Sequence, residues 1–224
     1  MAKKKLWLCA LALAIALAVL LLLYFLPQRG PGETFRIPDH IVICLDAGHG
    51  GDDPGAVNGD RLEKDDNLNM ALAVRDALEA AGHDNLEVVL TRSDDTGLTL
   101  EDRVDFANHR NATLFISFHR NSGGGQGVET WVSAAGLRPE MALANYIHKN
   151  LVDVGVAKDR GVKKGTAANP KASYYVVGNT LMPACLVELG FIDDDAADNT
   201  LLDEHFNDYA QAIADGILKM VKLK

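Results

Sequence analysis

The chain has 224 residues, of which 48% are hydrophobic and 24% are charged. At about 150 residues per domain, this length allows one domain plus a targeting segment or at most two small domains, with one core as the default. The apolar share excludes a disordered or collagen-like chain. Acidic residues outnumber basic ones by 31 to 22, and the net charge of −9 argues against a nucleic-acid partner. Three cysteines without C-x-x-C spacing exclude both a small disulfide-stapled fold and a thiolate zinc site.

The N-terminus has the pattern of a membrane anchor. Residues 6–26 form an unbroken apolar and aromatic run that follows lysines at positions 3, 4 and 5. About 20 apolar residues span the hydrocarbon core of a bilayer, and this run is longer than the apolar region of a cleaved signal peptide. We therefore predict a single-pass anchor over 1–26, a linker over 27–40 and a folded domain over 41–224, and whether the anchor is ever cleaved stays open. The lysines favour a cytoplasmic N-terminus, which would place the domain on the outer face of the membrane.

The first half of the domain alternates predicted strands and helices. Ile41–Leu45 is a short apolar run before a glycine-rich loop, which is typical of a buried strand. Apolar residues recur at helical spacing over 70–81 and Gly82 ends that helix. Leu86–Leu90 is the second predicted strand. Thr99-Leu100-Glu101-Asp102 resembles a capping box, and the helix it begins is expected to bury Leu100, Val104 and Ala107.

The second half continues the alternation. The predicted strands are Leu114–Phe118, Gly127–Val132, Ser173–Val177 and Ala184–Val187, and the predicted helices are Met141–Leu151 and a final one over 206–220. Strands that alternate with helices of this length imply right-handed crossovers. The predicted fold class is therefore α/β, with a mostly parallel twisted sheet covered by helices on both faces.

Polar side chains stand at the ends of three predicted strands, where packing alone would not place them. His49 follows the first strand, His119 the third, and Glu188 the strand that ends at Val187, while Glu63 stands just before the first helix. In open α/β sheets, ligands bind beyond the carboxyl ends of the strands. Two histidines and one carboxylate are a known ligand set for catalytic zinc, and a remaining glutamate would supply a general base.

Structural roles compete with these functional ones. Glu63 could be a helix-entry charge that the macrodipole favours, and Glu188 could be the ion-pair partner of Arg103 or of another cation. Arg103 could instead hold a substrate carboxylate. Cys44 and Cys185 lie in apolar strands, where free buried thiols are expected and a disulfide stays open.

Several motifs together make the chain resemble the zinc-dependent N-acetylmuramoyl-L-alanine amidases of bacterial cell-wall turnover. The resemblance runs in order from about Ile41 to Ile217, so it is more specific than any single motif. It rests on Ile43–Gly55, Glu63-Lys64-Asp65, Thr91-Arg92, Leu100–Arg103, Ala107-Asn108, Ser117–Asn121, Gly127-Val128-Glu129 and Pro183–Ile192. Arg120 departs from the family pattern, in which a small or apolar residue is common after the second histidine, and it leaves the local charge of the groove open.

The resemblance assigns roles to the four polar residues. It implies that His49, Glu63 and His119 bind Zn²⁺ and that Glu188 is the catalytic base. The implied reaction is hydrolysis of the amide between the lactyl group of N-acetylmuramic acid and L-alanine in peptidoglycan. A non-catalytic peptidoglycan-binding scaffold and a zinc hydrolase of another amide remain as alternatives, and a vegetative or sporulation role and a protein activator stay open.

Overall fold

A computed structural model describes residues 35–193 and 197–223. The strands are β1 (Ile41–Ala47), β2 (Val57–Asn58), β3 (Arg61–Leu62), β4 (Leu86–Leu90), β5 (Leu114–Asn121), β6 (Val128–Val132), β7 (Asp159–Lys164) and β8 (Ala184–Phe191). The helices are α2 (Glu63–Ala80), α3 (Leu100–His109), α4 (Arg138–Val154), α5 (Tyr175–Asn179), α6 (Asp198–Glu204) and α7 (Phe206–Met220).

One six-stranded sheet organises the domain, in the order β4-β1-β5-β8-β6-β7. The first four strands of that order are parallel to one another, while β6 pairs antiparallel with β8 and parallel with β7. The short β2 and β3 form a separate hairpin. The observed sheet is mixed but mostly parallel, which confirms the predicted α/β class.

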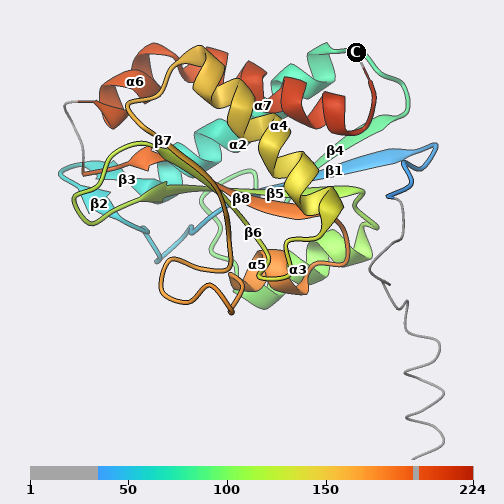
Figure 1. The fold of residues 1–224 in the computed structure, drawn as a ribbon, viewed down its shortest axis with the longest axis horizontal. Helices are drawn as coiled ribbons and strands as arrows, with labels where there is room; N and C mark the ends of the chain where they lie inside the picture. The colour runs from blue at the N-terminus through green and yellow to red at the C-terminus, as the bar shows by residue number, and fades with distance from the viewer. Residues whose placement is uncertain (1–34, 194–196, 224) are drawn as a thin grey trace, which may run out of the picture. The chain divides into compact units, whose positions relative to one another are not determined.

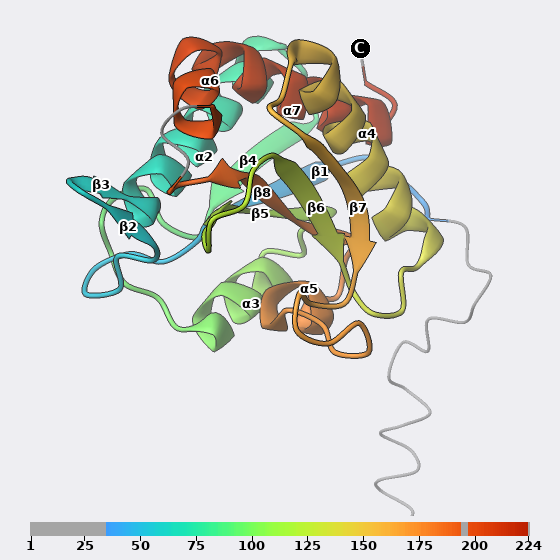
Figure 2. The ribbon, with the colours of Figure 1, turned by 60° about the vertical axis from the view of Figure 1, so that its left-hand side comes forward.

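Helices cover both faces of this sheet. In Figures 1 and 2, α2, α4, α6 and α7 lie on one side and α3 and α5 lie on the other. The helix α7 packs against both α4 and α2, which explains why one of its faces is apolar throughout. Phe115, Trp131, Val176 and Leu186 form part of the core beneath α3 and α5. Parallel strands buried on both faces need continuous apolar sequence, as the first five residues of β1 and the first four of β8 have.

Two local predictions are wrong. Ser173–Val177 was expected as a strand, but Tyr175–Asn179 is the helix α5, whose adjacent Val176 and Val177 are both buried. A strand would send these neighbours to opposite faces, whereas a helix on the sheet buries both. Leu100, expected on the buried face of α3, is 51% exposed because it occupies the first turn of the helix.

The capping box and the thiols follow expectation. Thr99 accepts a hydrogen bond from the Asp102 backbone amide, and the Asp102 carboxylate accepts one from the Thr99 amide. Cys44 and Cys185 are free and buried, and β5 lies between their strands. Two strand spacings exceed the reach of a disulfide.

The predicted membrane anchor lies outside the described residues. Within residues 35–193 and 197–223, no helix has the length and apolar character to cross a membrane.

Candidate metal centre

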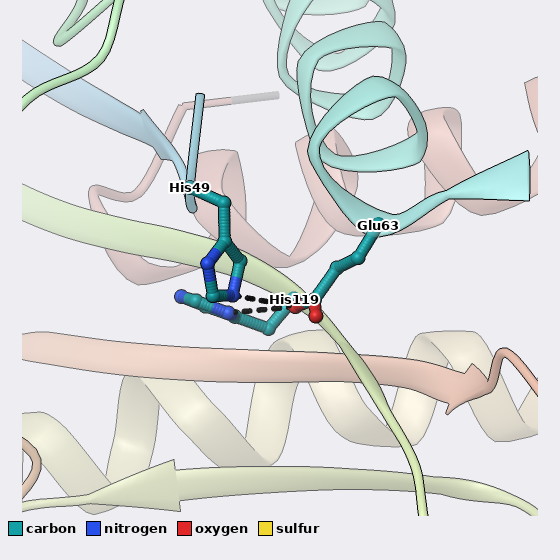
Figure 3. Close-up of side chains that lie close together, drawn as sticks. All are labelled: His49, Glu63 and His119. Atoms are coloured by element: carbon teal, nitrogen blue, oxygen red, sulfur yellow. Dashed lines mark hydrogen bonds and ion pairs between the residues drawn. The ribbon is translucent and has the colours of Figure 1, made fainter. Parts of the chain in front are cut away.

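Three side chains from separate elements meet at the carboxyl end of the sheet. His49 stands in the loop after β1, Glu63 is the first residue of α2, and His119 lies on β5. The Glu63 Oε1 atom is 3.2 Å from His49 Nε2 and 2.9 Å from His119 Nδ1. One potential ligand atom from each residue lies within 4.8 Å of the others, and Figure 3 shows the three side chains converging. The structure therefore brings together the three predicted metal ligands.

Glu63 is the buried centre of this group. Its side chain is 5% exposed, and its carboxylate also accepts hydrogen bonds from the backbone amides of Ala56 (2.8 Å) and Arg120 (3.0 Å). Burial alone would raise the pKa of Glu63, but hydrogen bonds from His119 and His49 outweigh it and hold the pKa well below the usual range. The group thus presents an ionised carboxylate between two imidazoles.

His49 is held from its other side by a carboxylate that the sequence reasoning missed. Its Nδ1 lies 2.7 Å from Asp53 Oδ2, which leaves Nε2 directed at Glu63. Burial favours neutral imidazole, but hydrogen bonds to Glu63 and then Asp53 outweigh it and raise the pKa of His49 to about 9. A carboxylate behind a histidine orients metal-binding imidazoles in many proteins. The signal that could have revealed Asp53 is its place four residues after His49 in the same glycine loop.

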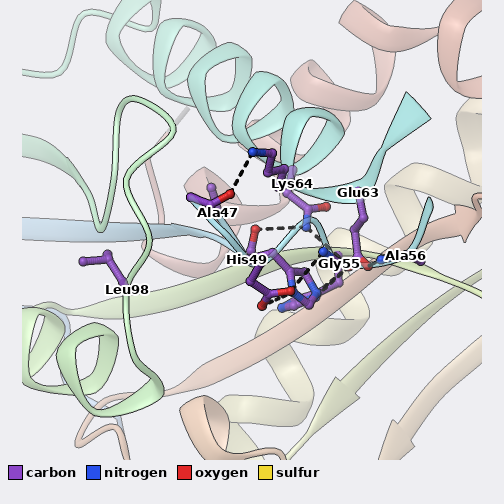
Figure 4. Close-up of polar contacts among 12 residues, drawn as sticks. Ala47, His49, Gly55, Ala56, Glu63, Lys64 and Leu98 are labelled. Carbon is purple, nitrogen blue, oxygen red and sulfur yellow. Dashed lines mark hydrogen bonds and ion pairs between the residues drawn. The ribbon is translucent and has the colours of Figure 1, made fainter. Parts of the chain in front are cut away.

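Glycines make room for the three side chains. A Cβ on Gly48 would lie 2.3 Å from His119 Cε1, and a Cβ on Gly55 would lie 2.6 Å from Glu63 Oε2. Figure 4 shows the loop that carries His49 and Gly55 lying against Glu63. Any side chain at either glycine would displace a candidate ligand, so the loop needs glycine at both positions.

Two buried arginines fix the loop that carries His49. Arg92 donates to the backbone carbonyl of Gly48 (3.0 Å), and Arg103 donates to that of His49 (2.7 Å). Arg103 also forms an ion pair with buried Asp46 (2.8 Å). Because the Arg103 guanidinium binds loop carbonyls and Asp46, the role of Arg103 is structural. The rigid loop helps to hold His49 at a positive φ of 61°, where histidine is uncommon.

Arg120 is directed into the protein. Its side chain is fully buried and binds Asp66 and Asn199, together with the carbonyls of Gly190 and Phe191. Arg120 therefore adds no exposed charge near the candidate ligands, because its guanidinium links α2 to the end of β8 and to α6.

Glu188 lies beside the group without joining it. It pairs in register with His119 across β5 and β8, so both side chains leave the same face of the sheet. Its Oε2 atom is buried and has no hydrogen-bond partner among the described residues. Burial raises the pKa of Glu188 to about 7. Glu188 is not the ion-pair partner of Arg103, because Arg103 pairs with Asp46.

Comparisons with known proteins agree with this arrangement. Residues 43–219 match the family model described as N-acetylmuramoyl-L-alanine amidase. The sporulation-specific N-acetylmuramoyl-L-alanine amidase of Bacillus subtilis is 34% identical, with 82% of this chain and 69% of that protein covered.

Solved structures show the same likeness. The catalytic domain of the amidase CwlV from Paenibacillus polymyxa is 40% identical with a TM-score of 0.72, covering 82% of this chain and 99% of that one. The CwlD amidase of Clostridioides difficile, solved in complex with the GerS lipoprotein, is 30% identical with a TM-score of 0.71 over 82% of this chain and 99% of that one. The chain belongs to the N-acetylmuramoyl-L-alanine amidase family.

Proposed function

We propose that this chain is a zinc-dependent enzyme that hydrolyses the amide between the lactyl group of N-acetylmuramic acid and L-alanine in peptidoglycan. The observation that supports it most directly is the convergence of His49, Glu63 and His119 beside Glu188, whose Oε2 has no hydrogen-bond partner within residues 35–193 and 197–223. Membership of the amidase family indicates which amide bond is cleaved, and the geometry of the three converging residues and Glu188 indicates metal-assisted hydrolysis.

The three converging residues suit zinc. Two imidazole nitrogens and one carboxylate oxygen are a common catalytic zinc set that leaves a position for water or substrate. The side chains of His49 and His119 are 25% and 21% exposed, so the group is accessible from solvent, while Glu63 is buried. Zinc in such a site acts as a Lewis acid that activates water near neutral pH and polarises a carbonyl.

Glu188 fits the role of general base. Its Oε2, which receives no hydrogen bond from the part of the chain that the structure describes, can accept a proton from the attacking water, and the protonated side chain can then donate that proton to the leaving amine of L-alanine. A general base works best when its pKa is near the working pH, and burial moves the pKa of Glu188 toward that range.

Residues 6–26 would place this chemistry at the cell wall. We propose a single-pass anchor with the domain on the outer face, on the support of the apolar run and the preceding lysines. Tethering would confine hydrolysis to peptidoglycan near the membrane.

Digestion of purified peptidoglycan tests the proposal. The zinc-loaded chain should release new free L-alanine amino groups and leave the glycan strands intact, and chelation should stop the reaction until zinc is restored. Binding without any cleavage would support the scaffold alternative. Cleavage inside the stem peptide would show a hydrolase of another amide, and new reducing sugars would contradict the amidase assignment.

A further inference from the structure

A second buried glutamate lies next to Glu188, and both of its carboxylate oxygens accept hydrogen bonds. Glu129 on β6 pairs in register with Glu188 on β8, and its side chain is 3% exposed. Its Oε1 accepts hydrogen bonds from Asn121 (2.8 Å) and Trp131 Nε1 (3.1 Å). With those two neutral donors on one oxygen, Glu129 is held in one orientation at the sheet surface.

The other oxygen of Glu129 is shared by two cations from the edge strand β7. Arg160 Nε lies 2.6 Å and Lys163 Nζ 2.5 Å from Glu129 Oε2. Burial would raise the pKa of Glu129, but these two cations outweigh it and lower the pKa. Two positive charges thus face one ionised carboxylate, and the cluster of Glu129, Arg160 and Lys163 keeps one positive charge in excess.

That excess charge faces solvent. The Arg160 and Lys163 side chains are 27% and 32% exposed, although Glu129 beneath them is buried. The Arg160 guanidinium lies over the Phe191 ring at 4.9 Å and the Lys163 ammonium over the Trp131 ring at 5.1 Å, so an aromatic ring holds each cationic group in place. Within residues 35–193 and 197–223, no group accepts a hydrogen bond from the two terminal nitrogens of Arg160. A guanidinium fork of this kind suits a carboxylate.

The order of the strands relates this charge to the reaction. Along β5, β8, β6 and β7, the sheet presents His119, then Glu188, then Glu129 and then the cation pair, and Figure 2 shows β7 beside β6 at the sheet edge. Glu188 therefore stands between the candidate metal ligands and the cations. Neighbouring strands are about 5 Å apart, and an extended peptide advances about 3.5 Å per residue. Both cationic groups reach Glu129 on β6, which is one strand spacing from Glu188. One or two residues of an extended peptide would therefore bridge the distance from Glu188 to the cations.

We propose that Arg160 and Lys163 form the subsite that binds a carboxylate of the stem peptide, one or two residues beyond L-alanine. The inference rests on the amidase function proposed above, because Glu188 would protonate the L-alanine amine and so set where the peptide leaves. The pair selects acidic stem peptides over those whose carboxyl groups are amidated. Glu129 is a positioning residue that holds both cations.

A pair of matched substrates tests this subsite. Two synthetic N-acetylmuramoyl-L-alanyl peptides differ only in whether the carboxyl groups of the two residues after L-alanine are free or amidated. A charge-assisted hydrogen bond is about twice as strong as a neutral one, so kcat/KM of the full-length, zinc-loaded chain should be about tenfold higher for the acid. Arg160→Gln and Lys163→Gln should each bring that ratio toward one, mainly through KM, and Arg160→Lys should keep part of it.

The control variant comes from the same strand. Lys164 follows Lys163 and pairs in register with Val132, so its side chain leaves the opposite face of the sheet. Lys164→Gln therefore removes the same charge without touching the cluster and should keep the parental ratio. Equal loss on both peptides in Arg160→Gln and Lys163→Gln would show a merely structural role. Equal rates for the two peptides in a parent that cleaves whole peptidoglycan would overturn the subsite and leave the amidase function standing. Failure to cleave peptidoglycan at all would overturn the function itself.

Discussion

Replacing Glu188 with glutamine separates the proposed base from the proposed ligands. Glu188→Gln keeps the shape of the side chain but cannot accept the proton of water, so turnover should fall by about 10²–10⁴-fold. Zinc should stay bound, because His49, Glu63 and His119 are unchanged. The matched variant is Glu63→Gln, which alters the carboxylate at the centre of the ligand group.

The two variants should also move stability in opposite directions in the metal-free protein. The pKa of Glu188 is raised from 4.5 to about 7, so the unfolded chain releases this proton at lower pH than the folded one. Folding stability therefore falls as pH rises from about 4.5 to about 7, by about 3 kcal/mol in all at about 1.4 kcal/mol per pH unit. Glu188→Gln removes this loss, so it should match the parent at pH 4 and exceed its stability at pH 8.

Glu63→Gln should have the opposite effect. Both oxygens of Glu63 accept backbone amide hydrogens, from Ala56 and Arg120. The amide group of glutamine would turn a donor toward one of them, and an unsatisfied buried donor costs about 1–3 kcal/mol. This variant should therefore lose both stability and zinc.

Three measurements on the variants decide the division of roles. They are the zinc content after purification, turnover on soluble wall fragments, and urea unfolding at pH 4 and pH 8 with a chelator present. Parental turnover in Glu188→Gln would place the base elsewhere. Loss of zinc from Glu188→Gln as readily as from Glu63→Gln would make Glu188 a ligand and refute the assignment.

Three further outcomes follow from the geometry of the site, and a fourth follows from the predicted domain boundary. Asp53→Asn should weaken zinc binding by about 10–100-fold, measured by competition with a chromophoric chelator, because Asp53 orients His49. Gly48→Ala should lose zinc while circular dichroism shows an intact fold, since its Cβ would lie 2.3 Å from the His119 ring. Zinc binding at pH 7 should release a proton from His49, whose pKa is raised to about 9 in the metal-free protein, and affinity should rise with pH up to that value. Calorimetry in buffers of different ionisation enthalpy measures this release. A chain that begins near Gly32 should be soluble and active on wall fragments, and a folded but inactive product would show a misplaced domain boundary.

Much of the sheet could be predicted from local pattern. The strand Leu86–Leu90 has the predicted bounds, and β1, β5 and β8 begin where their apolar runs begin, because strands inside a parallel sheet need continuous apolar sequence. The edge strand β7 escaped prediction because most of its residues are only partly buried. Polar edge strands are normal in proteins, since they discourage pairing with other chains.

The candidate ligands were predictable for a related reason. His49 and His119 are polar residues at the ends of buried strands, and parallel strands bring such ends to one edge of the sheet. The pairing of Glu63 with His119 joins residues 56 positions apart. No local spacing encodes that distance, so it followed only from the expected topology and the resemblance to the amidases.

Glu188 and Glu129 show where sequence reasoning stops. Both are glutamates within buried strands, and both stand on the same face of the sheet in adjacent register. Their roles diverge because Glu129 has four donors, two of them from β7, whereas Glu188 Oε2 has no partner among the described residues. Pairs of carboxylates with opposite environments are how active sites separate a base from an ionised group. The proposed base is therefore distinguished from Glu129 by its lack of hydrogen-bond donors among the described residues. Two of the donors to Glu129 come from β7, an edge strand that local sequence pattern did not predict.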